Sequence, residues 1–120
     1  MLFTMAIHTH DAGIKVAELT GRLTFGKPVT DVEEQLKEVV AEKPNGVIID
    51  LTGLDLLDSA GVGALVTIIS TAREQGVPLR VAGCKERTRN VLYMTQVNQL
   101  VVLLPDVQSA IASLGQASGA

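Results

Sequence analysis

The feature that most restricts the fold is the run at residues 47–51, which is apolar except for Asp50. A strand with one wet face would alternate apolar and polar residues, so this run is typical of a central strand covered on both faces. An apolar helical pattern follows from about Ser59 to Gln75, and Gly76 ends it. A buried strand followed by a deeply packed helix favours an α/β fold with a largely parallel sheet.

The rest of the chain continues this alternation. Two short segments joined by turn residues predict an opening β-hairpin of residues 2–9 and 14–20. The first helix is expected to begin at a cap formed by Thr30 or Asp31. The remaining elements are a strand at 77–82, a helix at about 86–96, a strand at 101–104, and a helix from Asp106 to a stop at Gly115. The predicted fold is a mixed, mostly parallel sheet of about five strands with about four packed helices, in the order β-β-α-β-α-β-α-β-α.

Length and charge set further limits. With 120 residues, the chain has room for one core, and we expect a single domain at 1–115 with a flexible tail at 116–120. A net charge of −3 argues against nucleic acid as a partner. The single cysteine, Cys84, forms no intramolecular disulfide and suits a reducing compartment. Without a signal peptide or a membrane-spanning run, the sequence predicts a cytoplasmic protein with no membrane insertion.

A phosphate-binding loop is the first catalytic motif to weigh. Residues 21–27 fit its first seven positions, but Pro28 stands where a Ser or Thr hydroxyl should bind magnesium. Proline also lacks the backbone N–H that such a loop needs, so a plain connecting loop is the better interpretation.

Acidic and metal-binding residues give no clear site either. Asp50, Asp55 and Asp58 lie near the carboxyl end of the central strand, but the chain lacks the early acidic pair and late lysine of a receiver-type phosphotransfer site. We interpret them as hydrogen-bonded loop carboxylates. The spacing of His8, His10 and Cys84 is not that of a transition-metal site, and no serine or cysteine nucleophile has a visible base. The sequence therefore predicts no metal, no cofactor and no enzyme activity.

A small basic cluster opens the third predicted helix. Lys85, Arg87 and Arg89 lie where the helix dipole disfavours cations. We interpret the cluster as a solvated first turn. A contact to an acidic partner surface is the alternative.

Ser59 is the most informative single residue. By itself it is an N-cap, whose hydroxyl accepts a backbone N–H from the first turn of the helix. Gly61 and Gly63 follow at once, although each costs about 1 kcal/mol in helix propensity relative to alanine. They indicate close packing, or another molecule approaching the backbone there.

The segment of residues 48–65, with Asp58-Ser59-Ala60-Gly61 at its centre, closely resembles the signature of STAS domains of the bacterial anti-sigma factor antagonist family. The resemblance covers nearly the whole chain and includes residues 19–23 and 76–83. It implies a mixed sheet with packed helices and no catalytic activity.

The resemblance also implies a function. In bacterial members of this kind, the serine matching Ser59 is phosphorylated by a partner that is both serine kinase and anti-sigma factor. The unphosphorylated form binds that partner and frees a sigma factor, and a serine phosphatase resets the cycle. By this resemblance Asp58 and Gly61 would shape the site, while Ala60 and Val62 would line the contact surface.

Thr24 marks a departure from the family pattern. Many antagonists carry an aspartate near this position, thought to face the partner, so Thr24 is a further candidate contact residue. The difference keeps a second function open: a non-switching STAS scaffold, or a regulatory subunit of another complex such as a lipid-transport system. A third function, binding of a nucleotide or another small ligand, is opposed by Pro28.

Overall fold

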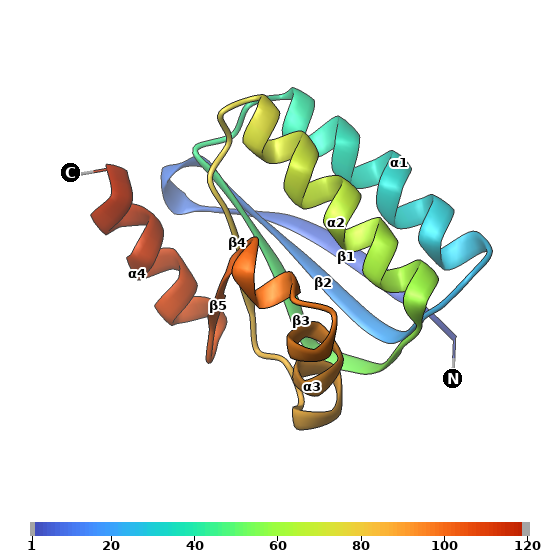
Figure 1. The fold of residues 1–120 in the computed structure, drawn as a ribbon. Coiled ribbons are helices and arrows are strands. Elements are labelled where there is room, and N and C mark those ends of the chain that lie inside the picture. The colour runs from blue at the N-terminus through green and yellow to red at the C-terminus, as the bar shows by residue number, and fades with distance from the viewer. Residues whose placement is uncertain (1, 119–120) are drawn as a thin grey trace.

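The computed structural model of the protein describes residues 2–118. Within them it confirms the predicted α/β fold, with one five-stranded mixed sheet and four α-helices in the expected order (Figure 1). The elements are β1 (Thr4–His10), β2 (Ile14–Leu23), α1 (Lys27–Ala41), β3 (Gly46–Leu57), α2 (Ser59–Glu74), β4 (Leu79–Ala82), α3 (Glu86–Met94), β5 (Val102–Leu104) and α4 (Val107–Ser118). Short 3-10 helices, η1 (Asp11–Gly13) and η2 (Val97–Gln99), lie between β1 and β2 and before β5.

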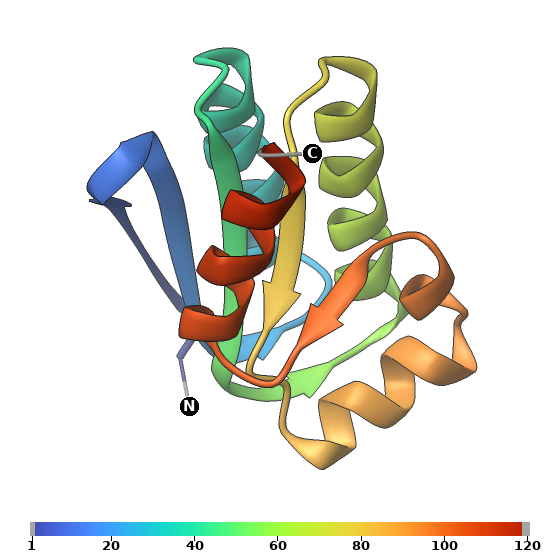
Figure 2. The same cartoon turned by 90° about the vertical axis from the view of Figure 1, so that its left-hand side faces the viewer.

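The strands lie in the order β1-β2-β3-β4-β5. β1 runs antiparallel to β2, as the predicted hairpin requires, and the other neighbouring strands are parallel. Helices α1 and α2 cover one face of the sheet and α4 covers part of the other (Figure 2). β3 is the central strand, and its carboxyl end leads directly into α2.

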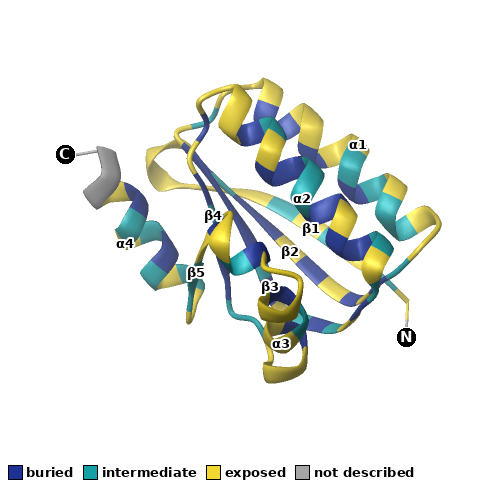
Figure 3. Ribbon diagram, viewed as in Figure 1, coloured by how far each residue is buried: buried dark blue, intermediate teal, exposed yellow. Residues whose placement is uncertain are grey.

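Burial of the central strand explains its apolar run. Val47 and Ile49 belong to the large core beneath α1 and α2, whereas Ile48 lies in the smaller core beneath α4. The prediction of a strand covered on both faces is confirmed. In α2, the buried residues form the face that packs on the sheet (Figure 3). No helix in the described part of the chain has the length and apolar character needed to cross a membrane.

The predicted start of α1 and the predicted ends of β2, β3 and α4 were wrong. α1 begins at Lys27 rather than at Thr30 or Asp31, because Pro28 fits a first helical turn, where its missing N–H needs no partner. β3 continues to Leu57, because β2 also continues to Leu23 and the two strands stay paired through two register shifts. This extension places residues 21–23 in a strand and leaves no phosphate-binding loop.

The last of these errors concerns the end of α4. α4 continues through Ser118, although Gly115 was expected to end it. Gly115 is not among the described glycines with positive φ, and that left-handed conformation is what lets a glycine end a helix. Residues 119–120 of the predicted tail lie outside the described part of the chain.

Candidate functional site

Asp58, not Ser59, is the N-cap of α2. Its backbone is extended, and its Oδ1 accepts the N–H of Gly61 at 2.8 Å. Its carbonyl oxygen accepts the N–H of Val62 at 2.9 Å, which is the first helical bond. Aspartate and serine are about equally good N-caps, so local sequence alone could not decide between the two neighbours.

The same carboxylate fixes the loop before α1. Its Oδ2 accepts the N–H of Phe25 at 3.0 Å, and the Asp58 N–H donates to the carbonyl of Leu23 at 3.4 Å. A serine hydroxyl lacks the second oxygen needed to hold two backbone groups on opposite sides. Asp58 therefore joins the start of α2 to the loop at residues 24–26.

These hydrogen bonds also determine the charge of Asp58. Burial by itself would raise the pKa of its carboxyl, but the N–H groups of Phe25, Gly61 and Ala60 outweigh it and hold the pKa below the ordinary value. The carboxylate is therefore ionised at neutral pH, as a charged cap at the positive end of a helix requires.

Because Asp58 caps α2, Ser59 has no role in capping the helix through its side chain. It is the first residue of α2, its side chain is exposed, and within the described residues its hydroxyl makes no hydrogen bond. Ala60, the residue after Ser59, is half-buried. Thr24, in the loop before α1, is also half-buried. The structure thus presents a free hydroxyl on a rigid helix start.

The two glycines of this first turn have different surroundings. A Cβ at Gly61 would clash with the carbonyl oxygen of Leu23 and lie 2.7 Å from Cδ1 of Leu57, so close packing explains this glycine. A Cβ at Gly63 would meet nothing within 4 Å. Val62, placed on the contact surface by the resemblance, is buried with 9 % of its surface exposed. Gly61 and Val62 therefore pack below the surface of the site and do not form that surface.

Phe25 is the residue that sequence reasoning missed. Its side chain is 84 % exposed although its backbone is tied to Asp58. A large apolar residue in a loop that contains a glycine could have pointed to Phe25. Its hydrogen bond to Asp58 joins residues 33 positions apart and cannot be seen in the sequence.

The other two predicted carboxylates, Asp50 and Asp55, are hydrogen-bonded as expected, but they lie within β3 and not in a loop. Asp50 accepts the N–H and hydroxyl of Thr52, at 3.0 and 2.6 Å. Asp55 forms an ion pair with Lys85. The hydrogen bond from Lys85, aided by the charges of Arg22 and Arg87, holds the pKa of Asp55 below its usual value. Within residues 2–118, no three acidic, His or Cys side chains are grouped closely enough to hold a metal ion.

Replacement of Ser59 with alanine is expected to leave the free energy of unfolding within about 0.5 kcal/mol of wild type, because Asp58 carries the cap. Urea denaturation followed by circular dichroism measures this. A loss near 1 kcal/mol, as for a true N-cap, would contradict the assignment of the cap to Asp58.

Solved structures of other proteins share this fold. An anti-sigma factor antagonist from Mycobacterium paratuberculosis is 22 % identical, with 94 % of each chain covered and a TM-score of 0.83. The phosphorylated form of the Bacillus cell fate determinant SpoIIAA is 14 % identical, with 92 % of this chain and 99 % of that chain covered and a TM-score of 0.72. The STAS domain of a SulP transporter from Vibrio cholerae is 18 % identical, with coverages of 93 % and 89 % and a TM-score of 0.72. At these identities the likeness shows the fold alone.

The sequence itself identifies the family. The family model described as STAS domain matches residues 6–110. The match includes most of β1, the other four strands, the first three helices and the whole site around Ser59. The fold, the Asp58-Ser59 helix start and this match agree, and the chain belongs to the STAS domain family.

Proposed function

We propose that this protein is an anti-sigma factor antagonist that acts as a protein-binding switch. It binds an anti-sigma factor with serine kinase activity while Ser59 is unphosphorylated, releases it when Ser59 is phosphorylated, and so regulates a sigma factor. The observation that carries the proposal is the exposed hydroxyl of Ser59 on a helix start that Asp58 already caps. STAS domains are typically non-catalytic, and we assign no enzyme activity to the chain.

Phosphorylation at this position suits the local structure. A phosphate at the first residue of α2 lies where backbone N–H groups and the helix dipole favour an anion. Because Ser59 does not cap the helix, its modification removes no stabilising hydrogen bond. The domain is therefore expected to stay folded in both states.

The switch acts by changing the contact surface. A phosphate adds about −1.5 to −2 charges to a surface that the partner must cover, and burying an unpaired charge is costly. Asp58, the residue before Ser59, is ionised and adds its negative charge beside the phosphate, whereas Asp55 is paired with Lys85. The new charge and its bulk are therefore the main cause of release.

The exposed and half-buried residues around Ser59 define the contact surface. Ala60 and Gly63 are small and allow a partner to approach the first turn of α2 closely. Thr24 and Phe25 lie in the loop that Asp58 fixes to that turn. Aromatic side chains, phenylalanine among them, are enriched in the cores of protein interfaces.

Intact-mass spectrometry of the protein from its native cells tests the proposal. We expect a phosphatase-sensitive gain of about 80 daltons, located at Ser59 by peptide fragmentation. Ser59→Ala should abolish the gain. Ser70→Ala, which changes an exposed serine farther along α2, should retain it.

A different result would favour the second function. Absence of the phosphoryl group in every growth condition, together with full function of Ser59→Asp, would contradict the switch. The chain would then be better explained as a non-switching scaffold or as a regulatory subunit of another complex, such as a lipid-transport system.

A further inference from the structure

We infer that the outer edge of β1 is a docking site for a second copy of this chain, which pairs with it antiparallel around a two-fold axis at Ala6. Ser59 follows β3, and β2 separates β3 from β1, so this edge is not part of the site around Ser59. The inference goes beyond the proposed function and does not depend on phosphorylation. It is supported by the length of β1, by its lack of charged residues and by its half-buried apolar side chains.

β1 is a long edge strand of the sheet. Its seven residues, 4–10, pair with β2 alone, and no helix in the described part of the chain lies beyond it (Figure 2). Successive residues of a strand direct their N–H and C=O groups to opposite sides, so about half of these residues direct theirs outward. Such an edge is a template for the addition of another strand.

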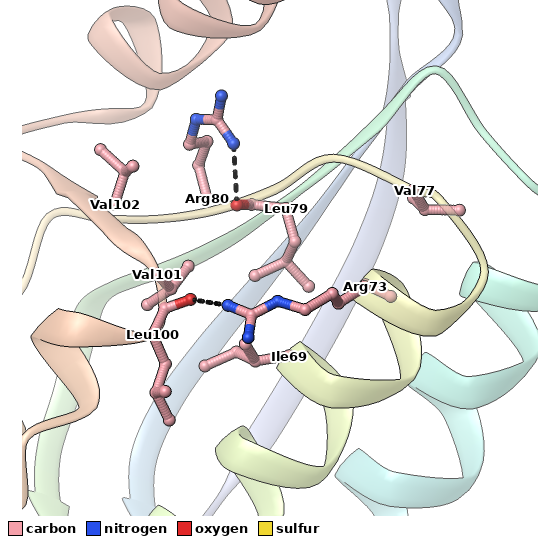
Figure 4. Close-up of a pocket in the computed structure, with 9 residues that line it drawn as sticks. Ile69, Arg73, Val77, Leu79, Arg80, Leu100, Val101 and Val102 are labelled. Carbon is pink, nitrogen blue, oxygen red and sulfur yellow. Dashed lines mark hydrogen bonds between the residues drawn. The ribbon is translucent and has the colours of Figure 1, made fainter.

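The opposite edge of the sheet is different. β5 has only three residues, so few of its backbone groups face outward. The segment before β5 is fixed to α2, because Nη2 of Arg73 donates to the carbonyl of Leu100 at 2.7 Å (Figure 4). A very short strand is one of the ways in which proteins protect a sheet edge from pairing. β1 is therefore the edge that is open to another strand.

The sequence of β1 lacks the features that usually prevent such pairing. These features are charged side chains, above all lysine, together with proline and bulges that distort the edge. β1 reads Thr-Met-Ala-Ile-His-Thr-His, with no Asp, Glu, Lys, Arg or Pro, and its register with β2 continues without a shift from Thr4 to His10. It has no charge that would select an acidic or a basic partner, and none that would oppose an identical strand. β1 therefore suits pairing with its own copy.

Apolar side chains define the register of this pairing. Met5 and Ile7 pack against the large core but remain half-buried at its margin. In antiparallel pairing around Ala6, Met5 of each copy lies opposite Ile7 of the other, on the sheet face that α1 and α2 cover. Leu2, which is 86 % exposed just before β1, comes opposite His10 of the second copy. The pairing therefore buries apolar surface on both copies as well as completing backbone hydrogen bonds.

Sedimentation velocity of the full chain, from about 10 μM to about 1 mM, tests the inference. We expect a reversible monomer–dimer equilibrium, because a single strand edge is a smaller contact than the roughly 1,200–2,000 Å² of a stable interface. Hydrogen exchange of the ¹⁵N-labelled protein locates the contact. Every second amide of residues 4–10 should exchange quickly in the monomer and more slowly as the dimer forms, whereas the amides of residues 102–104 should not change.

Charge variants complete the test. Ala6→Lys should weaken dimerisation about tenfold or more, because the two lysines meet at the two-fold axis. Ala6 is exposed, so the monomer should keep its fold, which circular dichroism checks. Ser70→Lys adds the same charge at an exposed position of α2 and should leave dimerisation unchanged. Ala6→Glu should also weaken dimerisation, and an equimolar mixture of the two Ala6 variants should associate again as a heterodimer.

Three results would overturn the inference. The first is a chain that stays monomeric at about 1 mM, which would leave this edge to a strand of another protein. The second is dimerisation that is unchanged in Ala6→Lys, or weakened equally by Ser70→Lys. The third is a dimer in which hydrogen exchange at residues 4–10 is the same as in the monomer, since the contact would then lie on another surface.

Discussion

Replacing Gly61 with alanine is expected to lower the free energy of unfolding by about 1–3 kcal/mol, whereas Gly63→Ala is expected to raise it by up to about 1 kcal/mol. The two glycines lie two positions apart near the start of α2, so both substitutions gain helix propensity. They differ in packing: a Cβ at Gly61 would clash with the Leu23 carbonyl oxygen, while a Cβ at Gly63 meets open space.

Urea denaturation of the two variants beside wild type measures this difference. Because each variant is the control for the other, the sign of the difference reports packing rather than propensity. Equal stabilisation by both substitutions would contradict the close approach of β2 to the start of α2, on which the geometry of the site depends.

Replacing Asp58 with alanine is expected to destabilise the protein by about 2 kcal/mol. The substitution removes the cap on the Gly61 N–H and the bond to the Phe25 N–H together. Amide hydrogen exchange should quicken both at Phe25 and in the first turn of α2. An effect confined to α2 would contradict the role of Asp58 in fixing the loop.

The same residue gives a pH dependence. The folded-state pKa of Asp58 lies below its ordinary value of 3.8, so its contribution to stability is present above that value and is lost as pH falls through the folded-state pKa. Asp58→Asn should therefore lose less stability than wild type as the pH falls below 3.8. Some acid sensitivity should remain, because the pKa values of Asp55 and Asp106 are also lowered.

Much of the fold could be predicted because its signals are local. The apolar run at 47–51 identified the central strand, and the spacing of apolar residues in α2 identified its buried face. Asp106 was expected to open the last helix, and its Oδ1 does accept the N–H of Ser109 at 2.7 Å. Each of these features depends on residues close together in sequence.

The parts that could not be predicted depend on distant contacts. Phe25 and Asp58 are 33 positions apart, and only the folded sheet brings the loop beside the helix start. The pairing of Asp55 with Lys85 likewise joins β3 to the start of α3 across 30 positions. The sequence therefore identified Asp58-Ser59 as the start of α2 but assigned the N-cap to Ser59 instead of Asp58.

The affinity of an anti-sigma serine kinase from the same organism for the two forms of the protein tests the central claim most directly. Calorimetric titration should show binding of the unphosphorylated chain and of Ser59→Ala, and a loss of about thirtyfold or more after stoichiometric phosphorylation at Ser59, since burying an unpaired charge costs roughly 2 kcal/mol or more. Circular dichroism should show that both forms are folded. Equal affinity of the two folded forms would contradict the account.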